Sequence, residues 1–152
     1  MTINGLGADD RGRRLGRKMS LLELIGPLLV VSAGASICRG TSVRVWVDNS
    51  GSVHIWRKGY CSPCPLTTTV ARATHVVASG LGCRLDVAKI TRCSTRGAVQ
   101  ADNLSKAAFH RFLGLWEGPL PDPSRVPLAL LRWIRRPVPS DSLGDRILDE
   151  IL

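Results

Sequence analysis

The sequence lacks the patterns that define several protein classes. Its five cysteines are an odd number at scattered positions, which is not the framework of a small secreted protein held by disulfides. Cys61 and Cys64 have the spacing of half a zinc site, but no second Cys-x-x-Cys follows. The three histidines stand far apart, without metal-ligand spacing. These absences favour reduced, partly buried thiols over a structural zinc site.

Long apolar runs and internal repeats are missing as well. The most apolar segment, residues 20–39, is interrupted by Glu23 and Pro27 and is too short for a membrane span. Residues 11–36 nevertheless combine a basic run, an apolar stretch and small residues, as a signal peptide does. We therefore expect a cytoplasmic or nuclear protein without a membrane partner. A small secreted or membrane-anchored protein is the alternative.

Acidic residues are few compared with basic ones. The chain has 12 Asp and Glu against 21 Lys and Arg, which gives a formal net charge of +9. Proteins with such an excess of positive charge bind phosphate backbones or anionic surfaces. The composition therefore favours nucleic acid as a partner.

The chain divides into three regions by composition, within the length of a single domain. Residues 1–18 are rich in Gly and Arg and are predicted to be a disordered basic arm. Residues 19–116 hold the periodic segments of an α/β domain. Residues 117–152 contain six of the nine prolines and are predicted to be a tail with two short amphipathic helices, at 127–136 and 142–152.

The central region predicts a strand–helix–strand unit. Ser20 and Glu23 fit a capping box that opens a helix, and Pro27 should bend or break it. A run of strand-forming residues ends at Asp48, where either Ser50 or Ser52 could cap the next helix. The expected elements are a helix at 20–39, a strand at 43–47, helices at 50–58 and 66–79, a strand at 84–92, and a helix that opens near 101 with Asp102 in its first turn. Strands connected in this way are parallel and covered by helices.

Three acids are candidates for a functional site. Glu23 lies on the first helix, Asp48 ends the first strand, and Asp102 opens the helix after the second strand. Each has an ordinary explanation by itself, since Asp closes strands and compensates helix dipoles. Their order on these elements is the reason to consider them together.

This order resembles the ribonuclease H-like regions of retroelement polyproteins, particularly those of fungal tyrosine-recombinase retroelements. The resemblance covers about residues 19–110. It rests on three segments: 20–24 (SLLEL), 45–53 (VWVDNSGSV) and 89–106, which ends in ADNLSK.

The resemblance implies a metal-dependent nuclease that acts on RNA paired with DNA. Glu23, Asp48 and Asp102 would be three of the four acids that hold two Mg²⁺ or Mn²⁺ ions, because hard oxygen ligands suit these cations. One ion would activate water and the other would stabilise the leaving oxygen. The expected partners are an RNA–DNA hybrid or DNA, and the missing N-terminal part of a polyprotein.

The departure from the family is at the N-terminus. The family begins with three strands ahead of the helix that carries Glu23, and the first strand supplies the Asp that bridges both metals. The 18 residues ahead of that helix show no strand pattern. We therefore expect a partial ribonuclease H-like α/β fold with two parallel strands, inactive as a nuclease in this chain. The alternative is a basic module that binds nucleic acid without cutting it.

Overall fold

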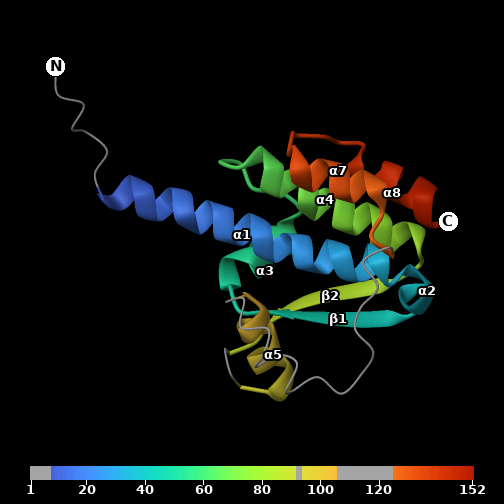
Figure 1. The fold of residues 1–152 in the computed structure, drawn as a ribbon, viewed down its shortest axis with the longest axis horizontal. Coiled ribbons are helices and arrows are strands. Elements are labelled where there is room, and N and C mark those ends of the chain that lie inside the picture. The colour runs from blue at the N-terminus through green and yellow to red at the C-terminus, as the bar shows by residue number, and fades with distance from the viewer. Residues whose placement is uncertain (1–7, 92–93, 106–124) are drawn as a thin grey trace.

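A computed structural model describes residues 8–91, 94–105 and 125–152 of the protein. In this part of the chain, seven helices accompany two strands, so the fold is mixed α/β (Figure 1). The elements are α1 (Ala8–Ala33), α2 (Ala35–Cys38), β1 (Ser42–Val47), α3 (Ser50–Lys58), α4 (Pro65–Gly80), β2 (Arg84–Lys89), α5 (Arg96–Ser105), α7 (Leu128–Arg135) and α8 (Leu143–Ile151).

The two strands confirm the predicted strand–helix–strand unit. β1 and β2 are parallel, with Val45 opposite Val87, and α3 and α4 connect them. Alternate residues of β1 face opposite sides of the sheet. Val43 and Val45 pack against the core on the side of the helices. The β-branched residues of this run therefore give the sheet one apolar face.

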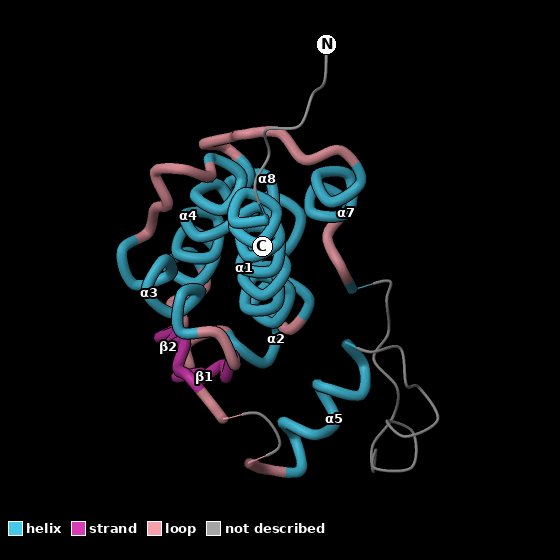
Figure 2. Tube along the Cα trace, turned by 90° about the vertical axis from the view of Figure 1, so that its left-hand side faces the viewer, coloured by secondary structure: helices cyan, strands magenta, loops and turns pink. Residues whose placement is uncertain are grey.

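Helices surround the sheet on two sides. α1 and α4 lie together over its apolar face, and α5 lies beyond the edge of β1 that does not face β2 (Figures 1 and 2). Fully buried side chains of α1 and α4, among them Leu28 and Val77, meet Val87 of β2 in one core. The core therefore lies between the sheet and the α1–α4 layer, and it holds α1 against the carboxyl end of β1.

Helix α1 is longer than the helix predicted at 20–39 at its N-terminal end. It begins at Ala8, within residues 1–18, and it runs through Pro27 without a break. Leu24, Leu28 and Val31 are buried on one face of this helix, so packing against α4 outweighs the single backbone bond that proline removes. Once this packed part is helical, each further residue toward the N-terminus extends the helix at little cost.

The boundaries of the other helices and strands differ from the predicted boundaries by a few residues. α3 spans residues 50–58 as expected, and Gly59 follows it in the left-handed conformation at φ 74°. The N-cap of α3 is Asn49 and not Ser50 or Ser52, because the side-chain oxygen of Asn49 accepts the N–H of Gly51 at 2.8 Å. β2 ends at Lys89, and residues 92 and 93 lie outside the described part. α5 begins at Arg96, so Asp102 is inside the helix and not in its first turn.

Both tail helices form, and both pack onto the rest of the chain. Leu130, Leu143 and Ile147 are fully buried and join the core. Glu150 of α8 accepts the N–H groups of Leu128 and Ala129, at 2.6 and 2.8 Å, and so satisfies the first turn of α7. Among the described helices, none is long and apolar enough to cross a membrane.

Candidate acidic site at the end of the sheet

Two of the three predicted acids lie side by side. Glu23 comes from α1, and Asp48 follows the last residue of β1. Burial raises the pKa of Glu23 above its ordinary value of 4.5, and the negative charge of Asp48 raises it further. The sequence therefore brings these carboxylates together through packing of α1 onto the strand.

Hydrogen-bond donors from the start of α3 surround Glu23. The Ser52 hydroxyl, on a fully buried residue, donates to Oε2 of Glu23 at 3.0 Å. This bond, and a weaker contribution from the Asn49 side chain, lower the pKa of Glu23 and so oppose the effects of burial and Asp48. The N-terminal end of α3 carries a partial positive charge. The site is a carboxylate pair on a helix N-terminus, partly neutralised by its neighbours.

The third predicted acid, Asp102, is on α5, and its side chain lies outside the described part of the chain. Gly97 and Ala98, in the first turn of α5, line the same groove as Glu23 and Asp48. The start of α5 therefore lines the groove that holds the carboxylate pair. The structure brings two of the three acids together and leaves the side chain of the third undescribed.

The acids stand at one end of an apolar groove of about 670 Å³. Its walls are α1, the length of β1 and the start of α5. Arg84 N–H donates to Thr41 and Ile90 N–H donates to Val47, so alternate residues of β1 point their backbone groups toward β2. The backbone groups of Arg44 and Trp46 consequently point to the other edge. Among the described residues, no strand pairs with that edge.

Trp46 lies on the surface, although tryptophan on a strand usually packs inside. The residue is 52% exposed and lies on the face opposite the α1–α4 layer. Arg44 covers it at 5.5 Å from the ring centroid and pairs with Asp86 at 2.7 Å. The alternation along β1 decides this, because Val47 turns inward and Trp46 must then turn outward.

Carboxylate and hydroxyl oxygens are the donor set that Mg²⁺ accepts, and one or two protein carboxylates with several waters are its usual environment. Glu23 and Asp48 fit one such cation. Among the described side chains, no three His, Cys, Asp or Glu residues gather into a larger metal site. The residues that the structure places therefore fit one hydrated ion and not a pair.

Sequence reasoning missed Ser52 and Asn49 as parts of the site. Both follow Asp48 within four residues, and this closeness in the sequence is the signal that could have indicated them. Comparisons with protein-family models, curated proteins and solved structures found no match to this chain. The proposals below rest on the residues and their geometry, and on the resemblance in sequence.

Proposed function

We propose that this chain is a remnant of a retroelement ribonuclease H-like domain and that it does not cleave RNA–DNA hybrids by itself. In this proposal, Glu23 and Asp48 are two metal ligands that remain from the ancestral site, and they hold a single Mg²⁺ or Mn²⁺ ion. Asp102 is the third residue of that ancestral set.

The observation that carries the proposal is the contact between Glu23 and Asp48. They are far apart in the sequence, and a helix and a parallel strand bring them to one place beside the start of α5. A second carboxylate beside an Asp that only ends a strand would destabilise the fold, because the two negative charges repel each other. A bound cation would remove that cost, and this is a physical reason to place both acids there.

The roles follow from the contacts. Ser52 holds Oε2 of Glu23 in place, and in this proposal the carboxylates of Glu23 and Asp48 bind the ion together. A bound ion of this kind stabilises negative charge on a phosphate oxygen. The resemblance implies a further acid on a strand that pairs beside β1, and the described part of the chain has no strand there. One ion without that acid supports binding, but not the two-metal reaction of the family.

The first experiment is a cleavage assay with the 152-residue chain, a labelled RNA–DNA hybrid and either Mg²⁺ or Mn²⁺. We expect no cleavage above the rate of the metal salt alone. Cleavage by the unaltered protein that disappears in Asp48→Asn would show that the inactive assignment is wrong.

The second experiment measures Mn²⁺ binding by calorimetry. Glu23→Gln and Asp48→Asn should each weaken binding about tenfold or more, because each removes a charged ligand. Asp145→Asn is the matched control, since Asp145 is an exposed carboxylate on α8. Equal binding by all four proteins would refute a cation site at Glu23 and Asp48.

A basic module that binds nucleic acid without cutting it is the second candidate. The net charge of +9 favours it, and so does the half-exposed ring of Trp46 under the Arg44 guanidinium. A base can stack on such a ring, and each stacked base contributes about 1–3 kcal/mol.

Its test is fluorescence anisotropy with a single-stranded oligonucleotide at low and high salt. Affinity should fall steeply with salt, because phosphate contacts release counterions. Trp46→Ala should weaken binding more than Trp46→Phe, which keeps an aromatic face. Affinity that does not change with salt would count against this candidate.

A further inference from the structure

Two cysteines stand at the two ends of a tight turn ahead of α4. The backbone N–H of Cys64 donates to the carbonyl of Cys61 at 3.0 Å, which closes a four-residue turn. Such a turn brings its end Cα atoms within about 7 Å, and disulfides need about 4.4–6.8 Å. Both residues are partly exposed and carry thiols in this structure. The turn therefore holds the two Cα atoms within the range that a disulfide spans, and both residues are exposed enough for a small molecule to reach them.

A buried donor is directed at one of these sulfur atoms. The hydroxyl of Thr67, a residue only 1% exposed, donates to Sγ of Cys64 at 2.8 Å. Cys64 is also the N-cap of α4, a 16-residue helix, so the positive end of the helix lies beside it. The hydroxyl donor and the helix N-terminus are the two geometric reasons to assign the attacking sulfur to Cys64.

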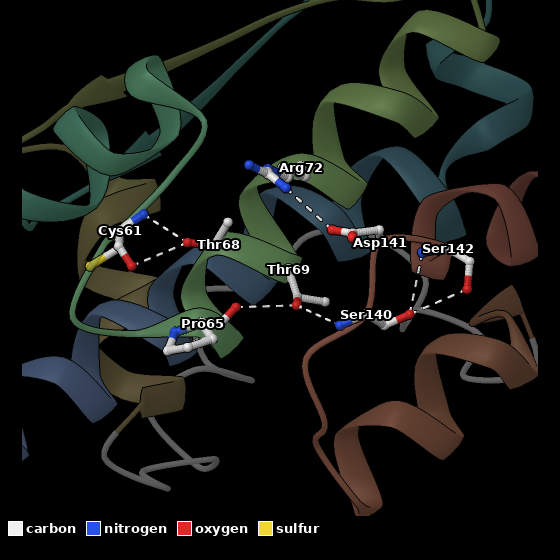
Figure 3. A network of polar contacts seen from close by, with 8 residues as sticks. All are labelled: Cys61, Pro65, Thr68, Thr69, Arg72, Ser140, Asp141 and Ser142. Atoms are coloured by element: carbon white, nitrogen blue, oxygen red, sulfur yellow. Dashed lines mark hydrogen bonds and ion pairs between the residues drawn. The ribbon is translucent and has the colours of Figure 1, made fainter.

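The turn is fixed in place by α4. The N–H of Cys61 donates to the Thr68 hydroxyl at 2.8 Å, and that hydroxyl lies 3.2 Å from the Cys61 carbonyl (Figure 3). On the same helix, Thr69 bonds to the Pro65 carbonyl and accepts the N–H of Ser140 (Figure 3). The first turn of α4 therefore fixes both cysteines, and the segment ahead of α8 holds that turn.

The other two described cysteines lie in different surroundings. Cys38 and Cys83 are 3% and 8% exposed. Burial raises the pKa of Cys38, and the neighbouring Cys83 raises it further. Protonated thiols inside the core react slowly with reagents in solution. Cys38 and Cys83 are therefore an internal control, against which the reactivity of Cys61 and Cys64 can be compared.

We propose that Cys61 and Cys64 are a redox-active dithiol, which low-molecular-weight disulfides oxidise reversibly to an intramolecular disulfide. The Cys64 thiolate attacks one sulfur of the small disulfide, forms a mixed disulfide and releases one thiolate. The Cys61 thiol loses its proton to solvent and attacks the Cys64 sulfur, which releases the second thiolate. Two cysteine thiols are oxidised, and one small disulfide is reduced to two thiols.

The site is independent of the acidic site. Glu23 and Asp48 lie at the beginning of α3, whereas the dithiol follows its end at Gly59. Among the described side chains, no further pair of metal ligands lies beside the two cysteines to complete a zinc site. Failure of the cation or nuclease experiments would leave the dithiol unaffected.

The experiment incubates the full chain with oxidised glutathione, blocks remaining thiols and digests with trypsin. Cleavage after Lys58 and Arg72 yields one peptide, 59–72, that contains Cys61 and Cys64 and no other cysteine. We expect this peptide to lose the mass of two hydrogen atoms, and reduced glutathione should reverse the change. The peptides that contain Cys38 and Cys83 should remain blocked as thiols.

Two variants test the assignment of the sulfur atoms. Cys61→Ser should accumulate the mixed disulfide with glutathione at Cys64. Thr67→Val should form the mixed disulfide about tenfold more slowly, since one hydrogen bond to a charged group is lost. Thr74→Val is the matched control, because Thr74 is equally buried on α4 and bonds to Val70 instead.

Four results would overturn the proposal. The first three are a peptide 59–72 that stays a dithiol under excess oxidised glutathione, a preferred bridge between Cys38 and Cys83, and equal rates for Thr67→Val and the unaltered protein. Stoichiometric zinc that protects Cys61 and Cys64 from oxidation would also refute it, in favour of a metal site.

Discussion

Glu23 has two contacts with opposite effects on stability, and two substitutions separate them. Its Oε2 accepts the hydroxyl of Ser52, which is fully buried, while its charge lies beside Asp48. Glu23→Ala removes the acceptor and leaves a buried hydroxyl without a partner, at a cost of about 1–3 kcal/mol. Glu23→Gln keeps an oxygen in that place and removes the charge that Asp48 and burial disfavour. We therefore expect Glu23→Gln to be as stable as the unaltered protein, or more so, at neutral pH without metal.

Urea denaturation at pH 7 measures this difference. For a chain of 152 residues, each kcal/mol corresponds to about 2–4 °C in Tm, so a thermal scan gives an independent reading. Ser52→Ala combined with Glu23→Ala removes both partners and should recover part of the loss, which a double-mutant cycle quantifies. If Glu23→Gln costs as much as Glu23→Ala, the charge of Glu23 stabilises the fold, and our account of the site is wrong.

Folding raises the pKa of Glu23, so protonation of Glu23 stabilises the folded state. This stabilisation is fully present below pH 4.5 and is lost as the pH rises through the pKa of Glu23 in the folded state. The stability of the unaltered protein relative to Glu23→Gln should therefore fall between pH 4 and neutrality, and a constant difference in urea titrations would contradict this. Gly144→Ala should cost about 1–3 kcal/mol, because a Cβ there would lie 2.7 Å from Val76, whereas Gly26→Ala meets nothing within 4 Å and should stabilise α1 by about 0.5–1 kcal/mol. Equal effects of these two substitutions on Tm would show that α8 does not lie against α4 as described. Ile147→Ala should cost about 2–5 kcal/mol in urea, and a value near zero would place α8 outside the core.

Local signals predicted most of the secondary structure. Residues 43–47 and 84–89 have strand propensities, and Gly59 supplies the left-handed residue that ends α3. These signals act within a few residues, so they are present in the sequence before any tertiary contact forms. The start of α1 and the start of α5 were not predicted, because glycines near both starts obscure the pattern, and packing decides how far a helix extends.

The candidate site was predicted only in part. The acids themselves are visible in the sequence, since each stands at a recognisable boundary or cap. Their distance from one another is not visible, because it depends on how α1 packs across the carboxyl end of β1. The Ser52 hydroxyl was missed for the same reason, since its partner lies 29 residues away on another helix.

The dithiol was likewise visible only in part from the sequence. The sequence gives two cysteines at a spacing that suits either half a zinc site or a redox pair. The turn, the cap position of Cys64 and the buried Thr67 hydroxyl favour the redox pair. Spacing limits what a pair of sulfur atoms can do, and the surrounding donors select among those possibilities.

The sequence by itself determined the order and kind of the elements, because propensity and capping depend on neighbours along the chain. It also determined the excess of positive charge, which no fold can change. Only the tertiary structure decided that Trp46 faces outward, that the tail helices complete the core, and that Glu23 meets Asp48. Each of these depends on burial, and burial is a property of surfaces that meet after the chain has folded.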